Sequence, residues 1–274
     1  MDEIKPVYDS SLLKPSFIEE FLCLLRYRGL IPRLISRIIT TRYKRSVLGL
    51  GWTMLNPLLT MIVMTIVFSA LFSNSIDNYP IYLLSGLFTW NFFVNSTSNS
   101  MSEMLAGAIM SQRIYLPRSI FVFAAIGAEL VNMLIAFIPL IIIMLFTGAK
   151  IGPALFVLPF SILLLLIFAS GIGLILATIV LFFTDIVQIY NVLLMILMYS
   201  SPIMYPREII PEKWRVMLWI NPFTYMLDII RPPIYNGIIP GPQAFLVSFL
   251  IAFITFLIGW FVFTSKVKEY AYRS

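Results

Sequence analysis

The chain has 274 residues, 60% of them hydrophobic and 12% charged, with a net charge of +6 and a mean hydropathy of +0.94. A soluble domain carries about 25% charged residues, and several apolar runs here exceed the ~18 residues that mark a spanning helix. The composition therefore indicates a multi-pass helical membrane protein, and its single cysteine and lack of histidine exclude an internal disulfide and the commonest metal-ligand and general-base chemistry.

The N-terminal part is predicted to precede the membrane spans and to cross no membrane itself. Residues 1–15 form a flexible, polar cytoplasmic tail, and residues 16–45 form an amphipathic helix with apolar residues at helical spacing and arginines elsewhere. A soluble amphipathic helix would show the same pattern. Direct fusion to a membrane span favours a helix that lies in the membrane interface.

Residues 46–274 are predicted to form one transmembrane domain with six spans. The expected spans are residues 52–72, 79–94, 120–146, 155–183, 186–204 and 244–264. The fourth and fifth meet at a tight turn, where Asp185 is expected to cap the following helix. Fourteen of the nineteen Lys and Arg residues lie on the side of the N-terminus, which predicts that both termini are cytoplasmic and that residues 205–243 lie outside.

Charged residues within the spans are few. Glu129 lies about ten residues into the third span, where an exposed carboxylate would be costly. It is either a pore-lining or proton-coupling acid, or a structural carboxyl bonded to a neighbour such as Asn132. No basic partner is evident along the sequence.

Two further segments have open interpretations. Asn91 and the polar run at residues 95–99, interleaved with aromatic residues, suit the rims and faces of sugars but also suit an interfacial aromatic belt. Residues 205–243 are too apolar for a free loop, and we expect two short re-entrant or interfacial helices there. These helices form either an exit gate or an outer lid without a gating role.

The run KRSVLGLGW at residues 44–52 stands before the first span. Its glycines are not followed by the Lys-Ser of a nucleotide-binding loop, so energy for active transport would come from another polypeptide or from an ion gradient. The basic residues are either a positive-inside anchor or a contact for a substrate phosphate.

Five segments are informative in combination: YKRSVLGLGWTMLNPLL (43–59), LSGLFTWNFF (84–93), QRIYLPRSI (112–120), FFTDIVQIYNVLLMILMYSSPIMYP (182–206) and NPFTYMLDIIR (221–231). Together they resemble the membrane-spanning subunits of ABC exporters for polysaccharides, the group that exports O-antigen, capsule and teichoic acid. One departure is Thr184, where relatives often carry an arginine before the Asp-Ile pair.

The resemblance implies a homodimer joined to two ATP-binding cassette subunits, which would hold the ATP and magnesium. No catalytic residue, metal, cofactor or nucleic acid is expected in this chain. Residues 103–117 would form a coupling helix, and residues 205–243 the external gate. The implied sites are an entrance for the lipid phosphate at Arg42, Lys44 and Arg45; a channel lining of Trp52, Trp90, Phe92, Phe93, Asn95, Glu129 and Tyr199; an ATPase contact at Glu103, Arg113, Tyr115 and Arg118; and a gate of Trp214, Trp219, Phe223 and Tyr225.

The expected function is that of a permease in the cytoplasmic (inner) membrane of a bacterium, which moves lipid-linked polysaccharide outward and breaks no covalent bond. A permease for a drug or a small lipid is the alternative. A membrane-embedded glycosyl- or acyltransferase is a further rival, but only Glu129 and aspartates at the membrane rims could serve its chemistry.

Overall fold

The computed structural model describes residues 16–72, 76–111, 117–149 and 151–273, and these residues form helices without any strand. The ten α-helices are α1 (Ser16–Arg26), α2 (Leu30–Tyr43), α3 (Gly51–Phe72), α4 (Tyr79–Ser111), α5 (Ser119–Phe146), α6 (Leu158–Phe182), α7 (Ile186–Ser200), α8 (Val216–Ile220), α9 (Pro222–Tyr235) and α10 (Pro242–Arg273). Short 3-10 turns lie at Pro153–Val157, Arg207–Ile209 and Glu212–Trp214. The predicted all-α class is confirmed.

Within the described residues, four helical segments are long and apolar enough to cross a membrane: Gly51–Phe68, Ser119–Phe146, Pro153–Phe182 and Pro242–Lys266. They correspond to the first, third, fourth and sixth predicted spans. The other two predicted spans are helical but do not meet this criterion. The polar residues of α4 lower its hydropathy, and α7 has only 15 residues. The helix of the second predicted span also continues past residue 94, to Ser111.

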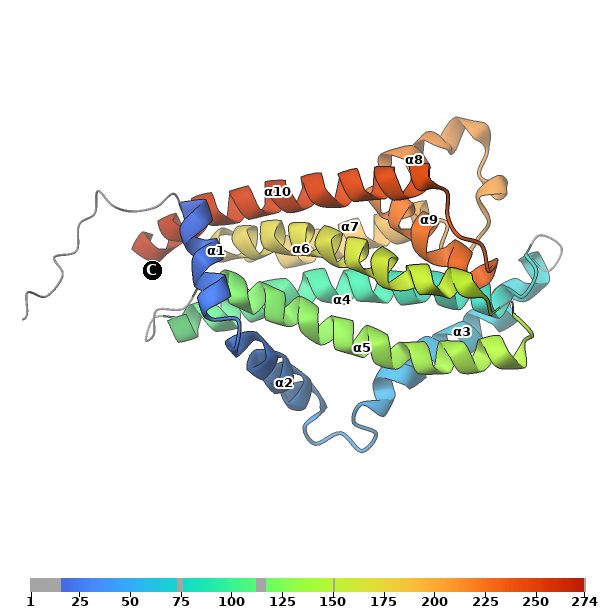
Figure 1. Cartoon of the computed structure of the whole chain (residues 1–274), viewed down its shortest axis with the longest axis horizontal. Coiled ribbons are helices and arrows are strands. Elements are labelled where there is room, and N and C mark those ends of the chain that lie inside the picture. Colours follow the sequence, from blue (N-terminus) through green and yellow to red (C-terminus); the bar gives the residue numbers. More distant parts are fainter. Residues whose placement is uncertain (1–15, 73–75, 112–116, 150, 274) are drawn as a thin grey trace, which may run out of the picture.

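The long helices lie side by side, with α6 packed closely against α10 (Figure 1). A Cβ atom added to Gly259 would lie 2.2 Å from the carbonyl oxygen of Gly171. The two backbones therefore touch at this crossing, and only residues without a side chain fit there. Among the four apolar segments, the one that contains α6 is the most deeply buried.

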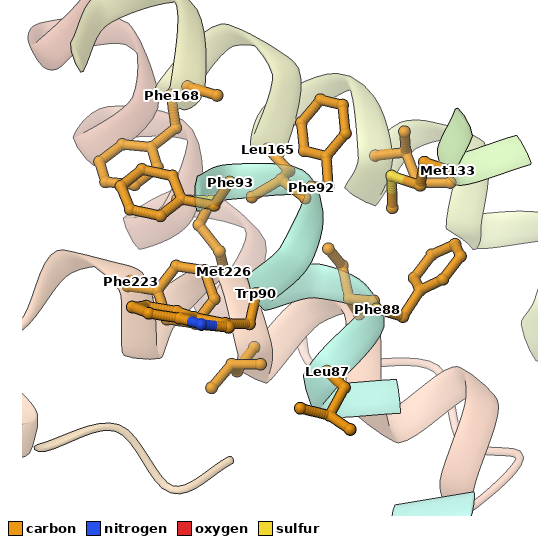
Figure 2. Close-up of a cluster of buried hydrophobic side chains, with 14 of the residues drawn as sticks. Leu87, Phe88, Trp90, Phe92, Phe93, Met133, Leu165, Phe168, Phe223 and Met226 are labelled. Atoms are coloured by element: carbon orange, nitrogen blue, oxygen red, sulfur yellow. The ribbon is translucent and has the colours of Figure 1, made fainter. Parts of the chain in front are cut away.

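An aromatic core joins α4, α6 and α9 (Figure 2). The ring of Trp90 meets that of Phe223 edge to face, with centroids 5.2 Å apart, and Phe93 stacks on Phe168 at 5.3 Å. All four side chains are buried. The core therefore fixes the outer helix α9 against the middle of the bundle.

The predicted amphipathic helix is two helices, because residues 27–29 form a turn between α1 and α2. The apolar face of α2 packs against α5 through Leu34 and Ile38, which are buried. In α1, Glu20 accepts hydrogen bonds from the backbone amide of Ser119 (3.0 Å) and from its hydroxyl (2.7 Å). The N-terminal helices are thus attached to the first turn of α5, where a carboxylate also interacts favourably with the helix dipole.

The segment between α7 and α10 lies at the opposite end of the bundle from α1 (Figure 1). Two α-helices, α8 and α9, are present where two short helices were expected. Asn221 caps α9 by accepting a hydrogen bond from the amide of Phe223 at 3.0 Å. Asp185 does occupy the N-cap position of α7, but its side chain makes no capping hydrogen bond.

A buried arginine of α9 fastens this outer segment to α4. Arg231 donates hydrogen bonds to the carbonyl oxygens of Pro202 (2.5 Å) and Ile203 (3.0 Å) and to the hydroxyl of Tyr82 (2.9 Å). Its guanidinium carbon lies 4.0 Å from the centre of the Tyr82 ring. Gly86 gives it room, since a Cβ atom there would lie 2.4 Å from Nη2 of Arg231.

Candidate functional site

A polar cavity of about 270 Å³ opens between α2, α3, α4 and α5. Its lining combines one ion pair, four asparagines and several aromatic side chains, and consists of Arg42, Tyr43, Trp52, Thr53, Asn56, Pro57, Phe88, Asn91, Phe92, Asn95, Glu129, Asn132, Met133 and Ala136. Helical spacing explains how the lining forms. Asn91 and Asn95, or Glu129 and Asn132, are three or four residues apart and therefore share one helix face.

Glu129 is the centre of the polar network. Its carboxylate accepts hydrogen bonds from Arg42 at 2.5 Å, from the side-chain amide of Asn99 at 2.8 Å and from that of Asn132 at 3.1 Å. The predicted bond to Asn132 is present. The expectation that Glu129 lacks a basic partner is wrong, because α2 packs on α5 and brings Arg42 to it from 87 positions away.

The two charges of this ion pair differ in their access to water. The Glu129 side chain is only 2% exposed, whereas that of Arg42 is 32% exposed. Burial lowers the pKa of Arg42 and the Glu129 carboxylate raises it, with a net upward shift, so the guanidinium stays charged. A fixed buried carboxylate thus holds a cation that still reaches solvent and the cavity.

Two oxygens beside the cavity lack a usual hydrogen-bond donor. The side-chain oxygen of Asn132 is buried and has no hydrogen-bond partner among the described residues. In α3, Pro57 lacks the amide hydrogen that would donate to the carbonyl of Thr53 in a regular helix. Both oxygens belong to residues that line the cavity. Together with the asparagine amides, they suit a ligand with many hydroxyl groups.

The basic residues before α3 are placed differently from one another. Arg45 and Gly49 adopt positive φ angles of 69° and 50° in the turn between α2 and α3. Glycine tolerates this conformation, while a residue with a side chain pays about 1–2 kcal/mol for it. Lys44 and Arg45 are exposed, and of the three predicted entrance residues only Arg42 lines the cavity.

The residues expected to line the channel fall into three groups. Trp52, Phe92, Asn95 and Glu129 line the cavity. Trp90 and Phe93 are buried in the aromatic core instead (Figure 2). Tyr199, on α7, is 66% exposed.

The expected coupling and gate residues are also dispersed. Glu103 lies on α4 and Arg118 directly precedes α5, but Arg113 and Tyr115 lie outside the described residues. Phe223 is buried in the aromatic core, whereas Trp214 and Trp219 are exposed at the outer end. Tyr225 lines a second, outer cavity with Trp219.

Sequence reasoning missed Thr53 and Asn56 as lining residues. The sequence did contain a signal for Asn56. Trp52 and Asn56 are four residues apart at the start of an apolar helix, so they share a helix face. Among the described residues, no group of three or more His, Cys, Asp or Glu side chains is placed to hold a metal ion.

Long apolar helices packed beside a polar cavity are typical of a multi-pass membrane transport protein. The chain matches the family model described as ABC-2 type transporter over residues 30–235, and it belongs to this family. It is a permease subunit, and its role is transport rather than catalysis.

Curated relatives extend over most of the chain. Two are O-antigen export system permease proteins RfbA of Klebsiella pneumoniae. One is 29% identical over 88% of this chain and 93% of its own length, and the other is 30% identical over 76% and 81%. The polysialic acid transport protein KpsM of Escherichia coli is 25% identical over 86% of this chain and 93% of its own length.

Proposed function

We propose that this permease exports a lipid-linked polysaccharide across the cytoplasmic membrane of a bacterium, using ATP hydrolysed by a partner subunit. The names of its relatives, which refer to O-antigen and polysialic acid, support a polysaccharide as the cargo. The observation that carries the proposal is the cavity itself, in which a solvent-accessible arginine stands beside asparagine amides and aromatic rings.

Each part of the cavity suits one part of such a substrate. The lipid carrier ends in an anionic phosphate group, which Arg42 can bind by exchanging one interaction with Glu129 for one with the phosphate. The glycan presents hydroxyl groups to the amides of Asn56, Asn91 and Asn95. Trp52 and the other aromatic rings provide flat apolar surfaces for sugar rings.

The proposed assembly is a homodimer of six-span subunits with two ATP-binding cassette subunits. All four apolar segments, together with α4 and α7, would cross the membrane. Support for both termini being cytoplasmic comes from the fact that α1 and the end of α10 lie at the same end of the bundle (Figure 1). The apolar face of α3 around Ile62 and Ile66 is exposed and would meet lipid or the second subunit.

Coupling to the ATPase would use the end of α4 and the residues that follow it before α5. Residues 103–117 are proposed as the coupling segment. The hydrogen bond between Glu20 and Ser119 attaches α1 to α5, the helix that follows this segment. A push on this segment would therefore also move α5, which carries Glu129. The outer helices α8 and α9 would act as the exit gate.

The test replaces the basic residues at the cavity in the intact complex. Arg42→Gln/Lys44→Gln/Arg45→Gln should reduce export of lipid-linked polysaccharide to below about one tenth, the loss of one charge-assisted interaction. The measurement is surface polysaccharide in cells together with co-purification of the ATPase subunit, which should not change.

The matched control is Arg28→Gln/Arg33→Gln/Arg37→Gln. It removes the same charge from exposed arginines of the same N-terminal segment, none of which lines the cavity. Export should remain near the level of the unmodified protein. Equal losses of export in both triple variants would contradict the proposed phosphate contact. They would indicate that the basic residues serve only as a membrane anchor.

A further inference from the structure

A second cavity, of about 430 Å³, lies in the outer segment between α7 and α10. It shares no residue with the inner cavity, and its lining consists of Arg207, Glu208, Arg215, Leu218, Trp219, Thr224, Tyr225 and Asp228. These residues come from the first 3-10 turn of the segment, from α8 and its start, and from α9. The outer segment therefore contains a pocket of its own.

The charges of this outer cavity balance. Two arginines face two carboxylates, and one pair, Arg207 with Asp228, forms a hydrogen-bonded ion pair. A balanced set gives no preference for an anion such as the lipid phosphate. Because a guanidinium has five donor hydrogens and a carboxylate accepts about four hydrogen bonds, this pair retains capacity for neighbouring hydroxyl groups of a neutral ligand.

One buried polar atom in this cavity has no partner. The side chain of Thr224 is 3% exposed, and its hydroxyl makes no hydrogen bond to any described residue. An unsatisfied buried hydroxyl is costly, and such groups are normally paired. Since Thr224 lines the cavity, a ligand hydroxyl placed there would satisfy it.

An aromatic surface completes the site. The ring of Trp219 is available to a ligand, since this residue is 76% exposed and lines the cavity. The hydroxyl of Tyr225 donates a hydrogen bond to the carbonyl oxygen of Trp219 at 3.0 Å, which holds the two residues together. A flat apolar ring beside paired hydrogen-bonding groups fits the two kinds of surface that a pyranose presents.

We propose that this outer cavity is a saccharide-binding subsite that receives one pyranose unit of the glycan as it leaves the permease. The ring stacks on Trp219, adjacent hydroxyls bind Asp228 and Arg207, and a further hydroxyl bonds to Thr224. The inference rests on the proposed function for the identity of the ligand. It assigns a binding role to a segment that would otherwise serve only as a gate.

The experiment uses the complex of the permease with its ATPase in lipid nanodiscs, labelled with 5-fluorotryptophan. This chain contributes five tryptophans to the fluorine spectrum, and Trp219→Phe identifies the resonance of interest. The probe is the polysaccharide released by mild acid from its lipid in the cells that produce this chain. We expect a saturable shift of the Trp219 resonance.

Two variants and one control define the site. Thr224→Val and Asp228→Asn should each weaken the apparent affinity about tenfold, the loss of one good hydrogen bond. Trp214→Phe is the control, because Trp214 is an exposed tryptophan of the same segment that does not line the cavity. It should leave the saturable shift of Trp219 unchanged.

The outcomes separate this inference from the proposed function. A silent Trp219 resonance, or a shift that neither saturates nor depends on Thr224 and Asp228, overturns the subsite. ATP-dependent movement of lipid-linked polysaccharide is measured on the same wild-type complex in proteoliposomes. Movement with a silent Trp219 leaves the proposed function standing without the subsite, and a saturable shift without movement supports the subsite while it contradicts the proposed function.

Discussion

Arg42 is partly buried and Arg231 is almost fully buried, and the two arginines have different kinds of partner. Arg42 pairs with one carboxylate at the edge of a cavity, and about a third of its side chain remains exposed. Arg231 is 9% exposed, donates to two carbonyl oxygens and a tyrosine hydroxyl, and lies over the Tyr82 ring.

The difference shows which arginine can change partner. A cation at a cavity edge can exchange a carboxylate for a substrate phosphate, because its other hydrogens still face water. The buried Arg231 binds main-chain carbonyls just after α7 and the Tyr82 hydroxyl of α4, so it holds α9 to both. Its loss would leave these carbonyls unpaired, which is costly. We therefore assign Arg42 to substrate contact and Arg231 to structure.

The largest effect is expected at Arg231. Arg231→Met removes three hydrogen bonds and strands two buried carbonyl oxygens, which should cost about 3–5 kcal/mol of stability. The thermal midpoint of the detergent-purified complex should fall by about 10 °C. Scanning fluorimetry measures it.

Arg215→Met provides the comparison for this variant. Arg215 belongs to the same outer segment, but it is exposed and lies 3.8 Å from Glu212. A surface pair of this kind contributes less than about 1 kcal/mol. Equal thermal midpoints for the Arg231→Met and Arg215→Met variants would contradict the structural role of Arg231.

A smaller loss is expected from Gly86→Ala. The new methyl group would meet Nη2 of Arg231 at 2.4 Å and the carbonyl oxygen of Ile203 at 3.0 Å, and overpacking costs about 1–3 kcal/mol. Because Arg231→Met removes the closer contact, the double variant should lose less than the sum of the two single losses. Strict additivity in thermal denaturation would show that the two residues do not share this contact.

Gly29→Ala is the matched glycine control. Gly29 has a helical backbone conformation with φ of −69°, and nothing lies within 4 Å of an added Cβ atom. The change should be neutral or stabilising by up to about 1 kcal/mol, because alanine restricts the unfolded chain.

Apart from the two controls, the smallest effect on stability is expected at the inner ion pair. Glu129→Gln keeps an acceptor for Asn99 or Asn132 and frees Arg42 toward water, so it should cost about 1 kcal/mol. Arg42→Gln/Glu129→Gln should be no less stable than Glu129→Gln, since neither variant leaves a buried charge unpaired. A loss as large as that of Arg231→Met would place Arg42 in the structural class instead.

The sequence predicted the helical class and the approximate positions of the helices, because long apolar runs and the residues that interrupt them are local signals. It also indicated Glu129, since a lone acid in an apolar run is conspicuous, and the bond to Asn132 follows from helical spacing. Arg42 as its partner could not be predicted, because α2 approaches α5 only in the folded chain.

The aromatic residues of α4 show the same limit. Trp90, Phe92 and Phe93 are nearly consecutive, and the sequence alone predicted the same channel-lining role for all three. Helix rotation separates them, so that Phe92 lines the cavity while Trp90 and Phe93 pack on Phe223 and Phe168. Which face a helix turns inward depends on its neighbours.

By itself, the sequence determined that the chain is a helical membrane protein with a basic N-terminal segment, because hydropathy and charge are properties of each segment alone. The tertiary structure decided which polar groups meet. It placed Arg42 beside Glu129, buried Arg231 against Tyr82, and enclosed Thr224 and Asp228 in an outer cavity. The first two contacts join residues 87 and 149 positions apart along the chain, and only the packing of helices against one another brings them within bonding distance.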